Sequence, residues 1–134
     1  MGKIIVPAKD EALNEVLAFV DEILEANDCS MKAQMQIDIA VEELFVNIAH
    51  YAYGDENGEA EIEASVADGL CTISFKDKGV EFDPLKKPDP DITLSAEERQ
   101  IGGLGIFMVK KSMNSVAYER KDSTNILTIT KSIN

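Results

Sequence analysis

The sequence predicts an α+β fold, a two-layer α/β sandwich in which about three helices cover one face of a mixed, mostly antiparallel sheet. Two observations support this class. Apolar residues recur at helical spacing in two long segments, and elsewhere they alternate with polar residues in short segments joined by turns. Strands with one polar face need a helical layer on the other. The 134 residues are enough for a single domain, 1–134, with its own core.

The first part of the chain predicts a short strand and two helices. Residues 3–6 are mainly β-branched and are followed by Pro7, which predicts a strand that ends there. A helix over about 10–26 is indicated by apolar residues at helical spacing: Leu13, Val16, Leu17, Val20, Ile23 and Leu24. Ser30 is the expected N-cap of a second helix over about 31–52. The expected core residues of that helix are Met35, Ile39, Leu44, Phe45 and Ile48.

Strands dominate the rest of the chain. Apolar and polar residues alternate on both sides of Asp68-Gly69, which predicts two strands joined by a tight hairpin. The inward face of the second strand is expected to carry Cys71, Ile73, Phe75 and Asp77. A third helix is predicted over about 104–113, followed by closing strands at about 115–121 and 125–132.

The segment over 78–101 is rich in Pro, Asp, Lys and Gly and is too long for a simple connection. It is either disordered or a lid over a site, with the lid at about 80–101. The run Ser95-Ala96-Glu97-Glu98 matches a capping box and predicts a short helix within it.

The composition argues against several classes of partner. Asp and Glu total 25 against 13 Lys and Arg, giving a net charge of -12. Such a surface repels nucleic-acid phosphates and anionic lipids, so we expect no direct nucleic-acid binding, no membrane binding and a basic protein partner if any. Cys29 and Cys71 lack metal-ligand spacing and fit a reducing compartment, and no segment is long and apolar enough to span a bilayer. We therefore expect a cytoplasmic protein.

Polar residues interrupt the apolar pattern at two places. Glu43, Asn47 and His50 fall on one side of the second helix among apolar neighbours, where polar groups cost free energy unless they are paired or used. A solvated stripe with an i,i+4 hydrogen bond explains them equally well. Asp77 ends an apolar strand row and suits an acceptor for a ligand N–H, and Gly79 permits close approach or a positive φ. The alternative is an ordinary strand-end aspartate that turns into a loop.

Glycines open the third helix. The free backbone N–H groups at the start of a helix, next to glycines that allow close contact, form an anion site. The run Gly102-Gly103-Leu104-Gly105 fits this description but matches neither a Walker A loop nor G-x-G-x-x-G, and glycines before a helix are often simple hinges. Arg99 is positioned to help neutralise phosphate, or is solvated.

The order of these motifs resembles the GHKL ATPase superfamily, whose N, G1 and G2 boxes correspond to Glu43-x-x-x-Asn47, Asp77-x-Gly79 and Gly103-x-Gly105. The resemblance covers about residues 10–132. Within the superfamily, the stretches 42–53 and 101–109 are most similar to the anti-sigma-factor serine kinases of bacterial partner switching. The resemblance implies the histidine-kinase-like ATPase fold.

The resemblance also implies a role for each matched position, with ATP and Mg²⁺ as cofactors. Glu43 would be the catalytic general base and Asn47 the metal ligand. Asp77 would accept from the adenine amino group, with Gly79 making room. The remaining nucleotide contacts implied are His50, Phe82, Arg99, Gly102, Gly103, Leu104, Gly105 and Ile106. The family's threonine near adenine has no clear counterpart, since Asn125 is nearest and Thr128 is also available.

The function implied is that of an ATP-dependent serine/threonine-protein kinase that acts as an anti-sigma factor and phosphorylates a small antagonist protein. A homodimer and a sigma-factor partner are implied as well. The alternative is a non-catalytic ATP-binding regulator that sequesters a sigma factor or another partner. A histidine-kinase ATPase domain and a gyrase-like clamp are less favoured, because the sequence has no room for a phospho-acceptor hairpin or a transducer domain.

Overall fold

The computed structural model describes residues 2–54, 56–86 and 103–134, except for the side chains at 86 and 104. Its elements follow the predicted order along the chain. They are β1 (Gly2–Pro7), the 3-10 turn η1 (Asp10–Ala12), α1 (Leu13–Ala26), α2 (Met31–Tyr51), β2 (Glu59–Ala67), β3 (Leu70–Asp77), the 3-10 turn η2 (Pro84–Lys86), α3 (Gly103–Ser112), β4 (Ser115–Lys121) and β5 (Thr124–Ser132).

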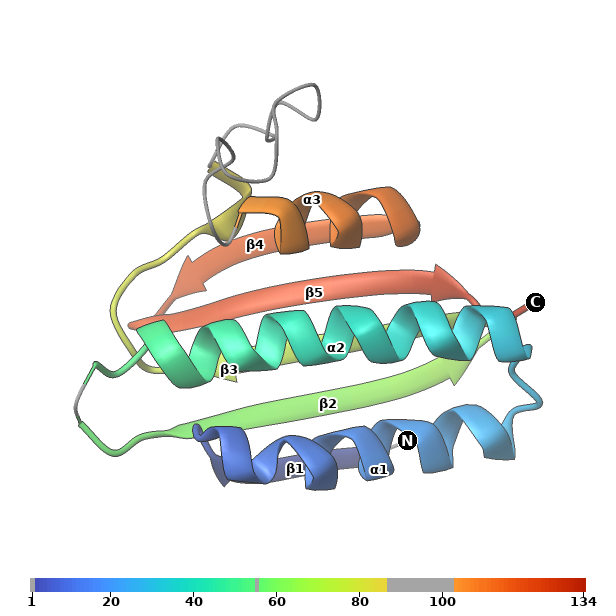
Figure 1. Ribbon diagram of the computed structural model, residues 1–134, viewed down its shortest axis with the longest axis horizontal. Helices are drawn as coiled ribbons and strands as arrows, with labels where there is room; N and C mark the ends of the chain where they lie inside the picture. The colour runs from blue at the N-terminus through green and yellow to red at the C-terminus, as the bar shows by residue number, and fades with distance from the viewer. Residues whose placement is uncertain (1, 55, 87–102) are drawn as a thin grey trace.

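The strands form one five-stranded sheet in the order β1-β2-β3-β5-β4. Each of its four pairings is antiparallel, so the described sheet is antiparallel throughout rather than mixed. The three α-helices lie over one face of this sheet, which confirms the predicted two-layer arrangement (Figure 1). Helix α1 packs near β1 and β2, α2 covers β3 and β5, and α3 lies against β4.

Two tight hairpins set the register of the sheet. Asp68 and Gly69 have φ angles of 53° and 77°, and Asp122 and Ser123 have φ angles of 51° and 60°. Two successive positive φ values match the right-handed twist of paired strands. The hairpin at 68–69 places β3 so that its inward row is buried against the helices, with Asp77 at the end of that row.

Helix α2 begins as predicted but is rotated differently from the expectation. The Ser30 hydroxyl oxygen accepts a hydrogen bond from the Ala33 backbone N–H at 3.1 Å, which is an N-cap. The expectation that Met35 and Ile39 are core residues was wrong, since they are 63% and 56% exposed. The face of α2 that meets the rest of the protein carries Ala33, Ile37, Ala40, Val41, Leu44 and Phe45.

Two other expectations changed or fall outside the description. Residues 10–12 form a 3-10 turn before α1 rather than its first α-helical turn. The helix expected at 95–98, and most of the segment 80–101, lie outside the described residues. Within the described ranges, every helix is too short or too polar to cross a membrane.

Helices α1 and α2 bring two carboxyl groups together, Asp21 and Asp38. Burial, followed by a hydrogen bond with the Asp21 side chain and its charge, raises the pKa of Asp38 from 3.8 to about 7. The folded protein therefore keeps a proton that the unfolded chain releases at lower pH. Between these two values the folded state binds more protons, so its stability falls as pH rises.

We expect the free energy of unfolding, measured by urea titration, to be lower at about pH 7 than at about pH 5. The variant Asp38→Asn should flatten this dependence, because the amide keeps a hydrogen bond without titrating. The control is Asp28→Asn. Asp28 is exposed and has a positive φ that asparagine tolerates, so this variant should keep the wild-type dependence of stability on pH. An unchanged slope in Asp38→Asn would contradict the assignment.

Candidate functional site

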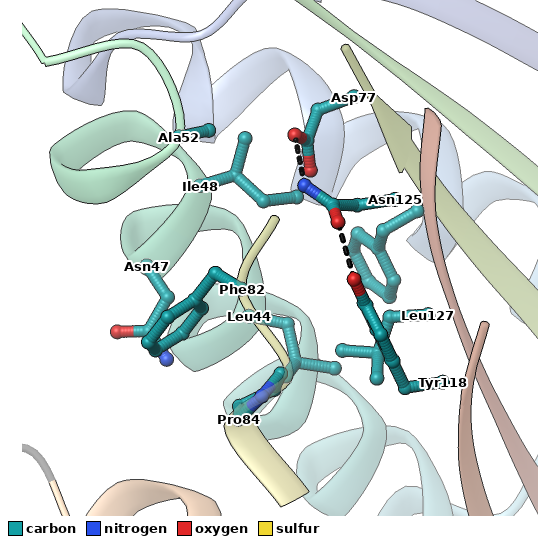
Figure 2. Close-up of a pocket in the computed structure, with 11 residues that line it drawn as sticks. Leu44, Asn47, Ile48, Ala52, Asp77, Phe82, Pro84, Tyr118, Asn125 and Leu127 are labelled. Carbon is teal, nitrogen blue, oxygen red and sulfur yellow. Dashed lines mark hydrogen bonds between the residues drawn. The ribbon is translucent and has the colours of Figure 1, made fainter. Parts of the chain in front are cut away.

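A pocket lies between α2 and the ends of β3 and β5 (Figure 2). The space between its walls, open solvent included, is about 430 Å³. Its wall is mostly apolar with a few polar groups, which is typical of small-molecule sites. The lining residues are Leu44, Asn47, Ile48, Ala52, Phe75, Asp77, Phe82, Pro84, Tyr118, Asn125 and Leu127.

Asp77 is the charged group of this wall and is 6% exposed. It faces the helices because it continues the inward row of β3. Its Oδ1 accepts hydrogen bonds from the Gly79 backbone N–H and the Asn125 Nδ2, each at 3.0 Å. Within the described part of the chain, no hydrogen bond reaches its Oδ2. The carboxylate is therefore held in place by one oxygen and retains acceptor capacity on the other.

Gly79 is required by the end of α2. A Cβ at this position would lie 2.1 Å from the Ala52 carbonyl oxygen. The neighbouring Val80 backbone N–H donates to the same oxygen at 2.7 Å. Of the two expected reasons for a glycine here, close approach and a positive φ, the structure supports close approach. The group that approaches is the backbone at the end of α2. That Gly79 also makes room for a base stays a prediction.

Three residues beyond the expected site residues complete this end of the site: Asn125, Tyr118 and Arg120. Asn125 is 5% exposed and lies directly opposite Asp77 in the β3–β5 register. Its Oδ1 accepts hydrogen bonds from the Tyr118 hydroxyl and from the Arg120 guanidinium. The sequence contained one indication of its importance: Asn125 is a polar residue in the same inward row of β5 as Leu127 and Ile129. Recognising its importance required the strand register, which brings it to Asp77.

At the other end of the site, Glu43 on α2 meets the first turn of α3. A Cβ on Gly105 would lie 2.1 Å from the Glu43 carboxyl carbon and from its Oε1. Partial burial, and then the charge of Glu42, raises the pKa of Glu43 above its ordinary value. Asn47 is one helical turn further along α2 and lines the pocket. One face of α2 therefore connects the start of α3, where Glu43 lies, with the pocket that contains Asp77.

The other expected nucleotide contacts lie in different parts of the structure. Phe82 lines the pocket and lies beside Tyr51, with ring centroids 6.2 Å apart. Ile106 is buried in the core. Arg99 and Gly102 lie outside the described residues, as does the side chain of Leu104, while Gly103 is the first residue of α3.

His50 lies in the last turn of α2 and is exposed. Its Nε2 lies 2.9 Å from the Asp10 carboxylate, and the imidazole is exposed and absent from the pocket wall. The start of the 3-10 turn η1 lies next to the end of α2, so Asp10 supplies the nearest partner for the imidazole. The nucleotide contact expected of His50 stays a prediction, and the described structure turns the imidazole toward Asp10.

Gly105→Ala offers a test of the contact between α3 and Glu43. Alanine favours a helix over glycine by about 1 kcal/mol, so the free energy of unfolding should stay the same or rise. The added methyl group must displace the Glu43 carboxylate, and any reaction that depends on this carboxylate should slow by about tenfold or more. Urea unfolding checks the first effect and an assay of that reaction checks the second, with Ser112→Ala on the same helix as the control. A variant in which that reaction keeps its full rate would contradict the contact.

Comparison with known proteins places this geometry in a family. Residues 6–131 match the family described as histidine kinase-like ATPase domain. The chain is 28% identical over 133 residues to serine-protein kinase RsbW of Listeria monocytogenes, covering 96% of this chain and 84% of the relative. It is 24% identical over 118 residues to serine/threonine-protein kinase BtrW of Bordetella bronchiseptica, covering 87% of this chain and 82% of the relative.

Solved structures agree on the fold. The RsbU and RsbW domains of Rv1364c from Mycobacterium tuberculosis match with a TM-score of 0.69 and 17% identity, over 99% of this chain and 33% of that chain. This chain thus spans about a third of that longer chain. The Erythrobacter litoralis EL346 blue-light activated histidine kinase matches with a TM-score of 0.57 and 17% identity, over 79% of this chain and 32% of that chain. Since the family match extends over residues 6–131, the chain belongs to the histidine kinase-like ATPase domain family.

Proposed function

We propose that this chain binds Mg-ATP and transfers its terminal phosphoryl group to a serine or threonine of a small antagonist protein, and so acts as an anti-sigma regulatory factor. One observation carries the proposal. Asn47 and Glu43 lie one turn apart on the same face of α2. Asn47 lines the pocket that also contains Asp77, and Glu43 lies against Gly105 at the start of α3. Relatives named serine-protein kinases support phosphoryl transfer as the reaction.

The base of the nucleotide is proposed to lie in the pocket beside Asp77. Leu44, Ile48 and Leu127 provide apolar walls for a planar ring. The Asp77 Oδ2 is the acceptor proposed for the adenine 6-amino group. Because Asp77 is buried, a hydrogen bond to it from a ligand competes little with water.

The phosphates are proposed to extend toward α3. The backbone N–H groups at Gly103 to Gly105 begin that helix, and a helix N-terminus favours anions. The neutral amide oxygen of Asn47 suits a hard cation, and Mg²⁺ commonly takes its other ligands from phosphate and water. When bound, Mg²⁺ neutralises charge on the phosphates.

Glu43 is proposed as the general base. Partial burial and the charge of Glu42 raise its pKa above the ordinary value, which makes the carboxylate a stronger base than a solvated glutamate. The carboxylate accepts the proton of the attacking hydroxyl, and its position against Gly105 keeps it near the proposed phosphate site. Most of the remaining rate enhancement comes from positioning of the two reactants.

Two measurements test the proposal. Mg-ATP should raise the thermal unfolding midpoint, because a ligand at about 100 times its Kd adds about 2.7 kcal/mol of stability. Incubation with ATP and a candidate antagonist protein should then give phosphoserine or phosphothreonine on the antagonist. Absence of stabilisation would refute ATP binding. Stabilisation without transfer to any antagonist would instead favour a non-catalytic regulator that sequesters a sigma factor. A cytoplasmic location and a homodimer are part of the proposal.

A further inference from the structure

The Asn125 side chain has all of its hydrogen-bonding capacity occupied. Its Nδ2 donates to the Asp77 Oδ1 at 3.0 Å and to the Val80 carbonyl oxygen at 2.7 Å. Its Oδ1 accepts from the Arg120 guanidinium at 3.0 Å and from the Tyr118 hydroxyl. Figure 2 shows this chain of groups running from Tyr118 through Asn125 to Asp77 along one wall of the pocket. A primary amide has two donors and two acceptor positions, so none is left over.

These partners fix the orientation of the amide. A guanidinium can only donate, and a carbonyl oxygen or an ionised carboxylate can only accept. Rotating the Asn125 amide by 180° would oppose its NH₂ to the Arg120 donor and its oxygen to the Asp77 and Val80 acceptors. The network therefore permits one orientation, in which an N–H always points at the Asp77 Oδ1.

The consequence falls on Asp77. Its Oδ1 already accepts from Asn125 and from the Gly79 backbone, which leaves Oδ2 for a ligand. A carboxylate with two free oxygens suits a pair of adjacent donors, as in bidentate contacts. Guanine offers such a pair, its N1–H and 2-amino groups, whereas adenine offers a 6-amino group. One free oxygen can satisfy the adenine donor but leaves one of the two guanine donors without a partner.

Building on the ATP site proposed above, we propose that Asn125 is a specificity-determining positioning residue. By occupying the Asp77 Oδ1, it directs the pocket toward 6-aminopurine nucleotides and against guanine nucleotides. Tyr118 and Arg120 act through Asn125 by fixing the direction of its amide. A buried donor left unpaired on the wrong ligand is the kind of mismatch that gives strong discrimination.

The test compares Kd values for Mg-ATP and Mg-GTP in the wild-type chain and in Asn125→Ala by isothermal titration calorimetry. The wild type should prefer ATP by about a hundredfold or more, and the variant should lose about tenfold or more of that preference. A merely structural role would weaken both nucleotides by the same factor and leave the ratio unchanged. Thr130→Ala, an outward position on the same strand, is the matched control and should keep the wild-type ratio.

The outcomes separate the two proposals. A wild-type chain that binds neither nucleotide overturns both. A chain that binds ATP but keeps its ATP/GTP ratio in Asn125→Ala overturns only the role of Asn125. If circular dichroism shows that Asn125→Ala is unfolded, wild-type binding of Mg-GTP and Mg-ITP decides, because inosine lacks the 2-amino group. The Kd values for Mg-GTP and Mg-ITP are expected to agree within about twofold, or neither nucleotide should bind. Binding of Mg-GTP about tenfold tighter than Mg-ITP would show that both Asp77 oxygens are available and would overturn the inference.

Discussion

Replacing Glu43 with glutamine is expected to slow phosphoryl transfer by about a hundred- to ten-thousand-fold, while the Kd for Mg-ATP stays within about threefold. Glutamine keeps the size of the side chain against Gly105 but cannot take the proton of the attacking hydroxyl. Initial rates of antagonist phosphorylation measure the first effect, and calorimetry measures the second.

Glu42→Gln is the matched control for this prediction. Glu42 precedes Glu43 and is exposed, so the same change at that position should leave the transfer rate near the wild-type value. Full transfer activity in Glu43→Gln would remove Glu43 from the mechanism. Equal losses in both variants would instead point to the net charge of this part of α2 rather than to a specific base.

Asp77→Asn is expected to raise the Kd for Mg-ATP by about tenfold to a hundredfold with little change in the free energy of unfolding. The amide oxygen of the new side chain can still accept from Asn125 and from the Gly79 backbone. An NH₂ group then takes the position of Oδ2. It faces the adenine amino group, and because both groups are donors no hydrogen bond forms between them. Calorimetry and urea unfolding measure the two quantities on the same preparation.

The control for this prediction is Asp68→Asn in the distant hairpin. Asp68 is exposed with a φ of 53°, a conformation that asparagine accepts, so ATP binding should be unaffected. An Asp77→Asn variant with wild-type affinity for Mg-ATP would show that this carboxylate is not the base acceptor. A large loss of stability in the variant would show instead that its main role is to hold Asn125.

Much of the fold followed from local patterns. Strand alternation identified the inward row that ends at Asp77, the run at Asp68-Gly69 identified a hairpin, and Ser30 identified the start of α2. These features depend on periodicity, backbone conformation and capping, which residues close in sequence determine. The same alternation also contained Asn125 as an inward polar residue of β5, although its partner could not be read from it.

Helix α2 illustrates what the local pattern left undecided. Its apolar residues occupy more than one side, so spacing alone did not distinguish Met35 and Ile39, which face solvent, from Ile37, which is buried. The rotation of a helix is settled by the summed packing of its whole length against the sheet and α1. Small residues at Ala33 and Ala40 allow that close contact on the buried side.

The sequence by itself determined the order of elements, the two layers and the inward direction of Asp77, because each depends on short-range periodicity and turn chemistry. Only the tertiary structure decided that Asn125 pairs with Asp77, that Gly79 packs on the end of α2, and that His50 turns to Asp10. Those contacts join segments separated by many residues. Strand register and helix packing, which no single segment encodes, bring them together.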